Sequence, residues 1–275
     1  MVRSISMRIR LLGVRAGSGS SSGAGSGAAD GGGLTSCIAV DDDAGVVRLV
    51  LDAGTGLAGI ADELGVREPP PILVSHAHRG HVAGLRRWCD ADGAHRLDVR
   101  VPAGTVLPHD LDRMPTTPLR VGDHGIGPFE VRVRAVPHGR RLTYGFRVSD
   151  AMGAFAYVPD HEPQQLGRGP HGWGAYHPDA VDLVYGVDVL LHGTMADAAR
   201  DVPVPAGHTV AQYAAGLAQR CHVPCVALVH HAPAFDERDL DALAERLAAE
   251  RGLRVLVGRA GDVLVPGELG RFDGR

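Results

Sequence analysis

The sequence predicts a layered α/β fold, and three observations lead to this prediction. Short apolar runs recur along the chain at strand length, and several are continuous, as in strands buried on both faces. Helical patterns fall among them, mainly after His81, after His208 and after Phe235. The composition is that of an ordinary globular protein, with 44% hydrophobic and 22% charged residues in 275. A chain of this length buries a substantial core.

The first strand is expected within residues 1–14, where the charges favour a strand over a signal peptide. The other apolar runs are each bounded by turn-forming residues, as strands are. These further predicted strands are Thr35–Val40, Val46–Leu51, Ile72–Val74, Leu97–Val101, Phe129–Val136, Tyr144–Val148, Phe155–Val158, Val187–Leu191, Val226–Val229, Leu253–Val257 and Val263–Val265.

The clearest helical pattern follows Phe235. Asp236 is a suitable N-cap, and Gly252 stands where a helix would end. Between them the leucines are spaced i, i+3, i+7, which places them on one face of a helix. These leucines are Leu240, Leu243 and Leu247.

Residues 16–33 consist almost entirely of Gly, Ser and Ala. Such a stretch cannot bury enough apolar surface to order itself, so we expect a flexible loop. Strand-like sequence follows at once, which indicates an insertion between two strands rather than a linker between domains. We therefore predict that residues 1–275 form a single domain.

The composition narrows the classes of partner. A formal net charge of −4 and an aromatic content of 4% argue against a nucleic-acid binder. The apolar runs are all shorter than the ~20 residues of a membrane span, so we expect a cytoplasmic protein. Cys221 and Cys225 are spaced for a metal or a disulfide, but Cys37 and Cys89 do not complete a zinc site with them. Buried free thiols are the favoured interpretation.

The main chemical feature is a group of histidines directly after the apolar run at 71–74. The segment reads Ser75-His76-Ala77-His78-Arg79-Gly80-His81. Alternation at a strand end points His76 and His78 to the same side, and His81 follows at the start of a helix. Neutral imidazole is a good zinc ligand, so this corner predicts a transition-metal site.

Here the chain resembles the metallo-β-lactamase superfamily, in particular its phosphodiesterase and ribonuclease Z-like branch, whose first motif is His-x-His-x-Asp-His. Five further segments resemble the family in the same order along the chain. They are Leu51-Asp52-Ala53-Gly54-Thr55-Gly56, Val136-Pro137-His138, Tyr157-Val158-Pro159-Asp160-His161, Ala206-Gly207-His208-Thr209 and Val229-His230-His231-Ala232-Pro233. The resemblance implies an αββα sandwich, with two packed mixed sheets and flanking helices.

The resemblance also implies a set of ligands for one or two divalent metal ions. His76, His78 and His138 would hold the first ion. His81 and His230 would hold the second, and Asp160 would bridge both. Two such ions activate water at neutral pH and stabilise displacement at phosphorus. Imidazole and carboxylate ligands suit Zn²⁺ best, and they also accept Mn²⁺, Fe²⁺ or Ni²⁺.

Two further histidines bear on the chemistry. The resemblance places His208 beside the substrate as a catalytic residue, a proton donor or an oxyanion partner, with Thr209 capping the helix that follows. His230 and His231 point to opposite faces of a strand, and the family pattern favours His230 as the ligand. Asp160 is the second residue to which the resemblance gives a catalytic role.

The chain departs from the family at Gly80, where the motif has an aspartate. In such hydrolases this residue binds the second metal and orients or deprotonates the attacking water, and glycine can do neither. The second site keeps His81, Asp160 and His230, which is enough for an open site. Neither Asp52 nor Asp110 is placed by the sequence to substitute. Asp52 is expected to hold the turn at Gly54 and Gly56.

Three functional hypotheses follow. The first is a metal-dependent hydrolase of a small-molecule ester, a phosphodiester or cyclic phosphate. The second is a metal enzyme repurposed for a non-hydrolytic biosynthetic step, a rearrangement or cyclisation, and the third is a non-catalytic ligand-binding relative. Arg140 and Arg141 follow His138 and could hold an anionic substrate, although a solvated surface pair fits equally well. Relatives in this branch are often homodimers, which makes a homodimer a further expectation.

Overall fold

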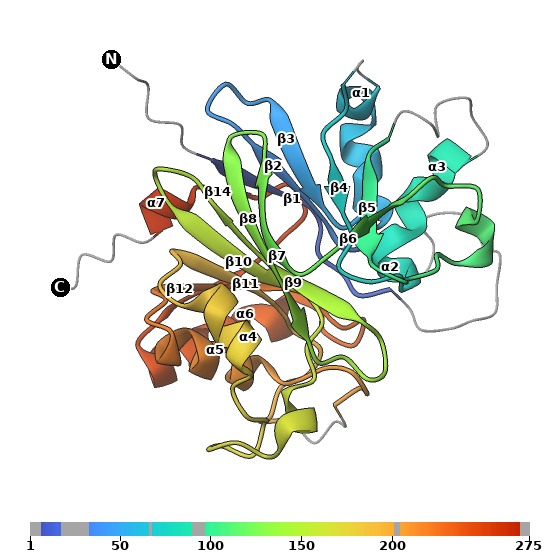
Figure 1. Cartoon of the computed structure of the whole chain (residues 1–275). Helices are drawn as coiled ribbons and strands as arrows, with labels where there is room; N and C mark the ends of the chain where they lie inside the picture. The colour runs from blue at the N-terminus through green and yellow to red at the C-terminus, as the bar shows by residue number, and fades with distance from the viewer. Residues whose placement is uncertain (1–6, 18–32, 66–67, 90–96, 201–203, 270–275) are drawn as a thin grey trace.

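The computed structural model describes residues 7–17, 33–65, 68–89, 97–200 and 204–269, which form two mixed sheets packed face to face (Figure 1). The first sheet contains, in spatial order, β14 (Val263–Leu264), β1 (Arg8–Gly13), β2 (Cys37–Asp41), β3 (Val47–Leu51), β4 (Ile72–Leu73), β5 (Val99–Pro102) and β6 (Thr117–Leu119). The second contains β13 (Arg254–Val257), β12 (Cys225–Val229), β11 (Val189–Gly193), β10 (Ala154–Val158), β9 (Thr143–Ser149), β8 (Phe129–Val136) and β7 (Gly122–Ile126).

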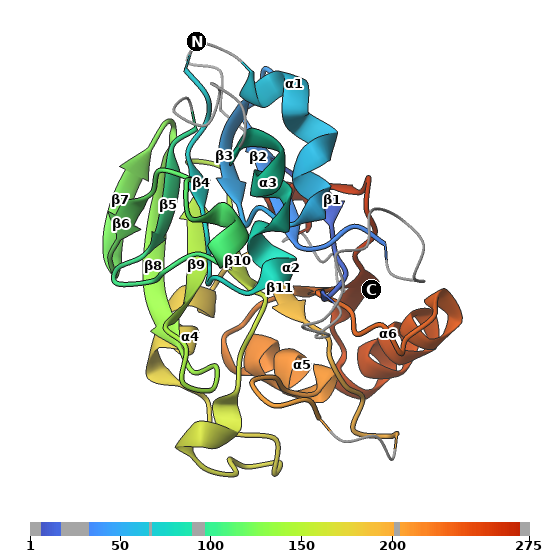
Figure 2. The ribbon, with the colours of Figure 1, turned by 90° about the vertical axis from the view of Figure 1, so that its right-hand side faces the viewer.

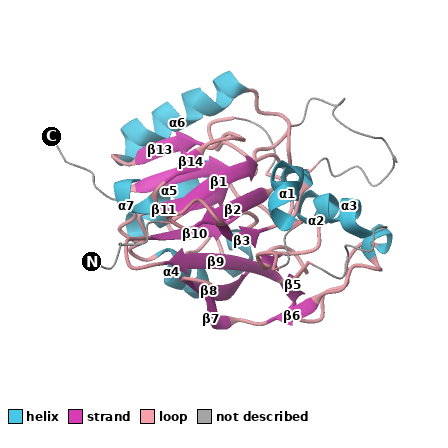
Figure 3. Cartoon of the chain, turned by 90° about the horizontal axis from the view of Figure 1, so that it is seen from above, coloured by secondary structure: helices cyan, strands magenta, loops and turns pink. Residues whose placement is uncertain are grey.

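Helices cover the outer faces of both sheets, as Figures 2 and 3 show. On the first sheet these are η1 (Thr55–Ile60), α1 (Ala61–Leu64), α2 (Arg79–Val82), η2 (Ala83–Leu85) and α3 (Arg86–Cys89). On the second they are α4 (Pro178–Val184), α5 (Ala211–Arg220) and α6 (Glu237–Arg251). Short turns η4 (His109–Leu111), η5 (Pro163–Leu166) and α7 (Pro266–Leu269) complete the described elements. The arrangement is the αββα sandwich that the resemblance implied.

Three apolar layers hold the sandwich together. The central layer fills the space between the sheets with fully buried side chains such as Leu11, Phe146 and Phe155. A second layer lies between the second sheet and α4, α5 and α6, and a third lies between the first sheet and its helices. Because the central strands pack on both faces, their sequences are continuous apolar runs rather than alternating ones.

Strand direction places the functional residues at one edge of the molecule. β3, β4, β5 and β6 are parallel to one another, and so are β10, β11, β12 and β13. The segments leaving the carboxyl ends of β4, β10 and β12 begin at Val74, Pro159 and His230. Ligand sites in open α/β sheets form beyond such strand ends, where side chains from separate segments converge.

Most predicted elements are confirmed. Each predicted apolar run contains a strand, and α6 begins after Asp236, whose side chain accepts a hydrogen bond from Asp239 N at 2.8 Å. Gly252 ends the helix in a left-handed conformation, and the predicted leucines are buried. β6 and β7 were not predicted, because they contain residues that disfavour strands. These are Pro118 in β6 and Gly122, Asp123 and Gly125 in β7. Both are edge strands, where such residues are tolerated.

Several smaller predictions have mixed outcomes. Thr209 does not cap α5, whose N-cap is Val210, and instead donates to Trp173 O at 3.3 Å. The cysteines are free thiols, and Cys221 and Cys225 are buried as predicted. Residues 18–32 of the predicted flexible loop at 16–33 lie outside the described residues. Among the described helices, none is long and apolar enough to cross a membrane.

Candidate metal centre

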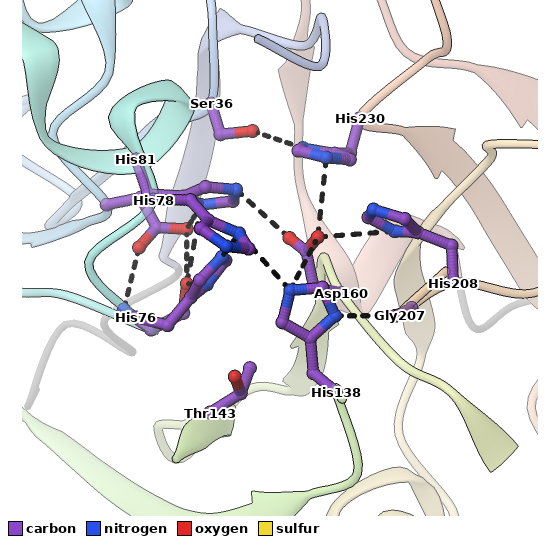
Figure 4. Close-up of polar contacts among 12 residues, drawn as sticks. Ser36, His76, His78, His81, His138, Thr143, Asp160, Gly207, His208 and His230 are labelled. Carbon is purple, nitrogen blue, oxygen red and sulfur yellow. Dashed lines mark hydrogen bonds and ion pairs between the residues drawn. The ribbon is translucent and has the colours of Figure 1, made fainter. Parts of the chain in front are cut away.

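The predicted histidine corner lies where β4 meets α2. The chain leaves β4 at Leu73, carries His76 and His78 in the connection, and enters α2 at Arg79, which places His81 within the first turn. His138 comes from the turn after β8, on the facing sheet. Figure 4 shows that these imidazoles converge with Asp160 and His230, although the ligand-bearing segments span more than 150 residues of sequence.

Three nitrogens form the first half of the site. His76 Nε2 lies 2.8 Å from His78 Nδ1, and His138 Nε2 lies 3.3 Å from that same Nδ1. The three ligand atoms all lie within 4.8 Å of one another, as donors around one ion do. Three imidazole donors in this arrangement suit a tetrahedral transition metal with one position open.

Asp160 lies between this group and a second one. Its Oδ2 is 3.0 Å from His81 Nε2, and its Oδ1 is 3.5 Å from His230 Nε2. Oδ1 is also 3.7 Å from His138 Nε2 in the first group. The carboxylate is 1% exposed, so its two oxygens are directed at imidazoles on both sides rather than at solvent.

The polar atoms at the centre of the site fit a divalent metal. His81 Nε2 and Asp160 Oδ2 are buried and lie 3.0 Å apart, but without the geometry of a hydrogen bond. Buried polar atoms that lack a well-formed hydrogen bond are costly, because each has lost its hydration. A cation between the imidazole lone pair and the carboxylate would satisfy both atoms. The donor set of imidazoles and one carboxylate is that of zinc and other first-row metals.

Four of the imidazoles are held from outside by a polar contact to Nδ1, so that Nε2 faces the centre. The contacts are His76 to Ser75 Oγ at 3.1 Å, His81 to Asp52 Oδ2 at 2.7 Å, His138 to Gly207 O at 2.5 Å and His230 to Ser36 Oγ at 2.8 Å. Such outer partners fix the tautomer and orientation of metal-binding histidines. Ser36, Ser75 and Tyr157 had no predicted role, and the structure places all three in this outer group.

Asp52 is structural, as predicted, but not in the predicted way. Its carboxylate accepts hydrogen bonds from Ser75 N at 2.7 Å, Ser75 Oγ at 3.0 Å and Tyr157 Oη at 2.8 Å, besides contacting His81. It therefore orients a candidate ligand and joins the two sheets, rather than holding the turn at Gly54 and Gly56. Asp110 does not substitute for the missing aspartate, since it pairs with Arg79 at 3.0 Å.

Gly207 shows why glycine is required beside His138. Its φ of +87° lies in a region that side chains disfavour, and an added Cβ would lie 2.6 Å from His138 Nδ1. The close approach lets the Gly207 carbonyl accept the imidazole hydrogen. Gly207 therefore supports the ligand through its backbone.

The charge balance of the site centres on His81 and Asp160. Burial would lower the pKa of His81, but Asp52 and Asp160 outweigh it and raise this pKa to about 10. Burial would raise the pKa of Asp160, but the surrounding imidazoles, His230 and His81 foremost, hold it well below its ordinary range. Burial also lowers the pKa of His230 to about 3, so at neutral pH His81 is the charged partner of Asp160.

Of the remaining predicted residues, His208 and His230 lie at the site, and His231 lies outside it. His208 Nδ1 lies 3.2 Å from Asp160 Oδ1, and its side chain is 13% exposed, so it contacts the centre and remains partly accessible to solvent. His230 adopts a left-handed conformation with φ of 50° and turns into the site. His231 turns away, with Nε2 2.9 Å from Gly258 O. His230 is therefore the one of the pair that the structure brings to the cluster.

A further pair of histidines lies behind Asp160 and was not predicted. His192, at the end of β11, has its Nε2 3.4 Å from His161 Nδ1, and both rings contact Tyr213. Burial lowers the pKa of both imidazoles, so the pair is neutral at physiological pH. Because each residue stands alone in its sequence segment, only the three-dimensional packing brings them together.

Comparisons with known proteins agree with this architecture. No protein-family model and no curated protein matches the sequence. Among solved structures, the metallo-β-lactamase-fold protein YhfI from Bacillus subtilis is similar with a TM-score of 0.68 and 16% identity, over 94% of this chain and 99% of that one. A diphosphatase from the PhnP family has a TM-score of 0.66 and 14% identity, over 94% and 97%. Zn²⁺-bound PqqB from Methylobacterium extorquens has a TM-score of 0.64 and 16% identity, over 94% and 99%.

This chain has the metallo-β-lactamase fold, and a His/Asp cluster that could hold a metal ion lies within it. At these identities the similarity establishes the fold and leaves the reaction to be argued from the site.

Proposed function

We propose that this protein is a metal-dependent hydrolase of a small anionic ester, a phosphodiester or cyclic phosphate. The observation that carries the proposal is the convergence of His76, His78 and His138 on one side of Asp160 and His81 and His230 on the other. Divalent ions held there would supply Lewis-acid activation of water and stabilise charge on phosphate oxygens. Zn²⁺ is the proposed metal, and similarity to a diphosphatase and to a zinc-bound protein supports the choice.

Arg141 is the candidate for holding the anionic group. It follows His138 in a tight turn, with Arg141 N 3.1 Å from His138 O, and its side chain is exposed. After burial, the charge of Arg141 is the largest influence that lowers the pKa of His78, to about 4. The guanidinium therefore acts on the site, and it forms no ion pair among the described residues. A free guanidinium can pair with a phosphate oxygen in bidentate geometry.

His208 is the proposed proton-transfer residue. Burial lowers the pKa of His208, so the imidazole is neutral at pH 7. Its Nδ1 contacts Asp160, which leaves Nε2 to exchange a proton with water or the leaving group. A proton-transfer residue is needed more here than in a protein with a carboxylate at position 80, because Gly80 cannot accept a proton from water. We also propose a small-molecule substrate rather than nucleic acid, since Arg141 is a local cation on a chain of net charge −4.

The direct test is hydrolysis of bis(p-nitrophenyl) phosphate by the metal-loaded protein. We expect turnover that chelation abolishes and that His78→Ala abolishes together with metal content. His222→Asn is the matched control, because this exposed histidine has a left-handed φ of 57° that asparagine tolerates. His208→Ala should lower kcat and keep the metal. Arg141→Ala should raise KM with little change in kcat.

The alternative functions give different results in the same assay. A repurposed metal enzyme would bind metal through His78 and show no hydrolysis of the generic diester. A non-catalytic relative would show no turnover, and its ligand binding would be insensitive to Asp160→Asn. Gly80 is the observation that keeps the repurposed enzyme as the second candidate, because the residue that would deprotonate water is absent.

A further inference from the structure

The surroundings of Gly80 differ from those of an ordinary glycine in a helix. A Cβ added to Gly80 would lie 3.1 Å from Gly17 N and 3.4 Å from Gly17 Cα. A Cβ added to Gly17 would in turn lie 3.1 Å from Gly80 Cα. Contacts this short are uncommon for real Cβ atoms, so neighbouring atoms would have to move. The two backbones touch where side chains would otherwise begin.

The segment that leads to Gly17 is held by contacts to the chain that follows His230. Ala16 N donates to His231 O at 2.9 Å, and His231 N donates to Val14 O at 2.8 Å. The Arg15 guanidinium donates to Phe235 O at 2.8 Å and pairs with Glu237 at 2.9 Å. Val14, Arg15 and Ala16 are thus tied to the chain that follows His230, and these contacts hold the adjacent Gly17 against Gly80.

Gly80 is also enclosed on its other side. A Cβ on Gly54 would meet Gly80 O at 2.3 Å, so the start of η1 packs directly against this carbonyl. The neighbouring Ala53 N donates to His81 O at 2.7 Å. Backbone contacts on two sides therefore set the position of α2, and with it the position of His81.

We propose that Gly17 determines the metal stoichiometry of the site, by filling the space in which a ligand side chain at residue 80 would begin. The second half-site then has His81, Asp160 and His230 from the protein, whereas Asp160 adds a fourth donor beside His76, His78 and His138. The second half-site therefore binds its ion more weakly than the first. This inference rests on the metal binding in the proposed function. It makes residues 14–17 a positioning element, because they act through α2 rather than on substrate.

The contact is tested first by thermal unfolding in chelator, where no metal contributes. Gly80→Ala adds only a Cβ and should lower Tm clearly. Gly125→Ala is the matched control, since nothing lies within 4 Å of a Cβ there, and it should leave Tm nearly unchanged. Equal Tm values for the two variants would overturn the proposal, because the space at residue 80 would then be free.

The consequence for the metal is tested by calorimetric titration with Zn²⁺ alone, which counts ions and measures both dissociation constants. Gly80→Asp should not bind the second ion more tightly than the wild type. The double variant Arg15→Ala/Gly80→Asp lacks the guanidinium contacts to Phe235 and Glu237, so Gly17 can yield to a side chain at residue 80. It should bind the second ion about tenfold or more tighter than Arg15→Ala alone. This pattern would support the role of Gly17.

Two outcomes would overturn the proposal. In the first, Gly80→Asp alone tightens the second ion as much as the double variant does. In the second, the double variant shows no gain although its fold is intact by circular dichroism. Because these readouts are ion counts and Tm, an absence of phosphodiester turnover would defeat the proposed function and leave this inference standing.

Discussion

The most informative single substitution is Asp52→Asn, because Asp52 orients the candidate ligand His81 and is not itself a candidate ligand. The carboxylate is fully buried and accepts from both Ser75 donors and Tyr157 while it faces His81. The amide keeps the size and one acceptor oxygen, but it loses the charge. Its NH2 group would then face hydrogen-bond donors in a site that water cannot reach.

The magnitude can be worked from the pKa of His81. Raising this pKa from 6.5 to about 10 corresponds to ~5 kcal/mol of stabilisation of the imidazolium, at 1.36 kcal/mol for each pKa unit. Asp52 and Asp160 share this effect, and removing one charge from a buried ion pair costs ~3–5 kcal/mol. Loss of charged hydrogen bonds acts in the same direction. We therefore expect Asp52→Asn to lower the free energy of unfolding by ~3 kcal/mol in chelator.

The assay is urea unfolding at pH 7, with Asp110→Asn as the control. Asp110 is a partly exposed ion-pair carboxylate, and its loss should cost only ~0–1 kcal/mol. In the metal-loaded protein, Asp52→Asn should also weaken metal binding by about 10-fold to 100-fold, as changes to outer partners of metal ligands do. If Asp52→Asn proved no more destabilising than Asp110→Asn, the account of Asp52 as the support of His81 would be refuted.

Further predictions follow from the other shifted groups. At pH 7 His81 is protonated without metal, so loading both half-sites with Zn²⁺ should release about one proton, seen by calorimetry in buffers of different ionisation enthalpy; no release would contradict the raised pKa. In chelator, the contribution of His81 to stability is complete below pH 6.5 and is lost as pH rises towards 10. The pKa values of His78 and His230 are lowered to about 4 and about 3, so their contribution is present above pH 6.5 and is lost as pH falls towards these values. The urea concentration at the midpoint of unfolding, measured across pH 4–10, should therefore be highest near pH 6.5 and fall on either side. A flat profile would argue against the raised pKa of His81 and against the lowered pKa values of His78 and His230. Burial raises the pKa of Cys221 to about 11 and of Cys225 to about 12, so neither thiol should react with an alkylating reagent at pH 8 until the protein unfolds.

Local sequence pattern was enough to predict most of the secondary structure. α6 followed from an N-cap, a leucine stripe and a terminal glycine, all within 17 residues of one another from Asp236 to Gly252. The buried strands followed from continuous apolar runs, because a strand covered on both faces needs them. Elements with weak local signals were missed, such as β7, whose pairing with β8 overrides its glycines.

The candidate site was predicted from motif order rather than from local pattern alone. The sequence determined which residue types were available, namely the histidines at 76, 78, 81, 138, 208 and 230 and the aspartate at 160. It could not determine how they meet, because they lie on segments separated by tens of residues. Parallel strand order and the packing of the two sheets bring those segments to one edge.

The finer points of the site depend on long-range packing. The left-handed backbone at His230 sends that imidazole inward and leaves His231 with Gly258. Asp52 reaches His81 because β3 and β4 are neighbours, and Gly17 reaches Gly80 because residues 14–17 pair with the chain at His231. Each of these contacts joins residues that are far apart in the sequence. Their geometry is set by long-range packing, which no window of neighbouring residues encodes.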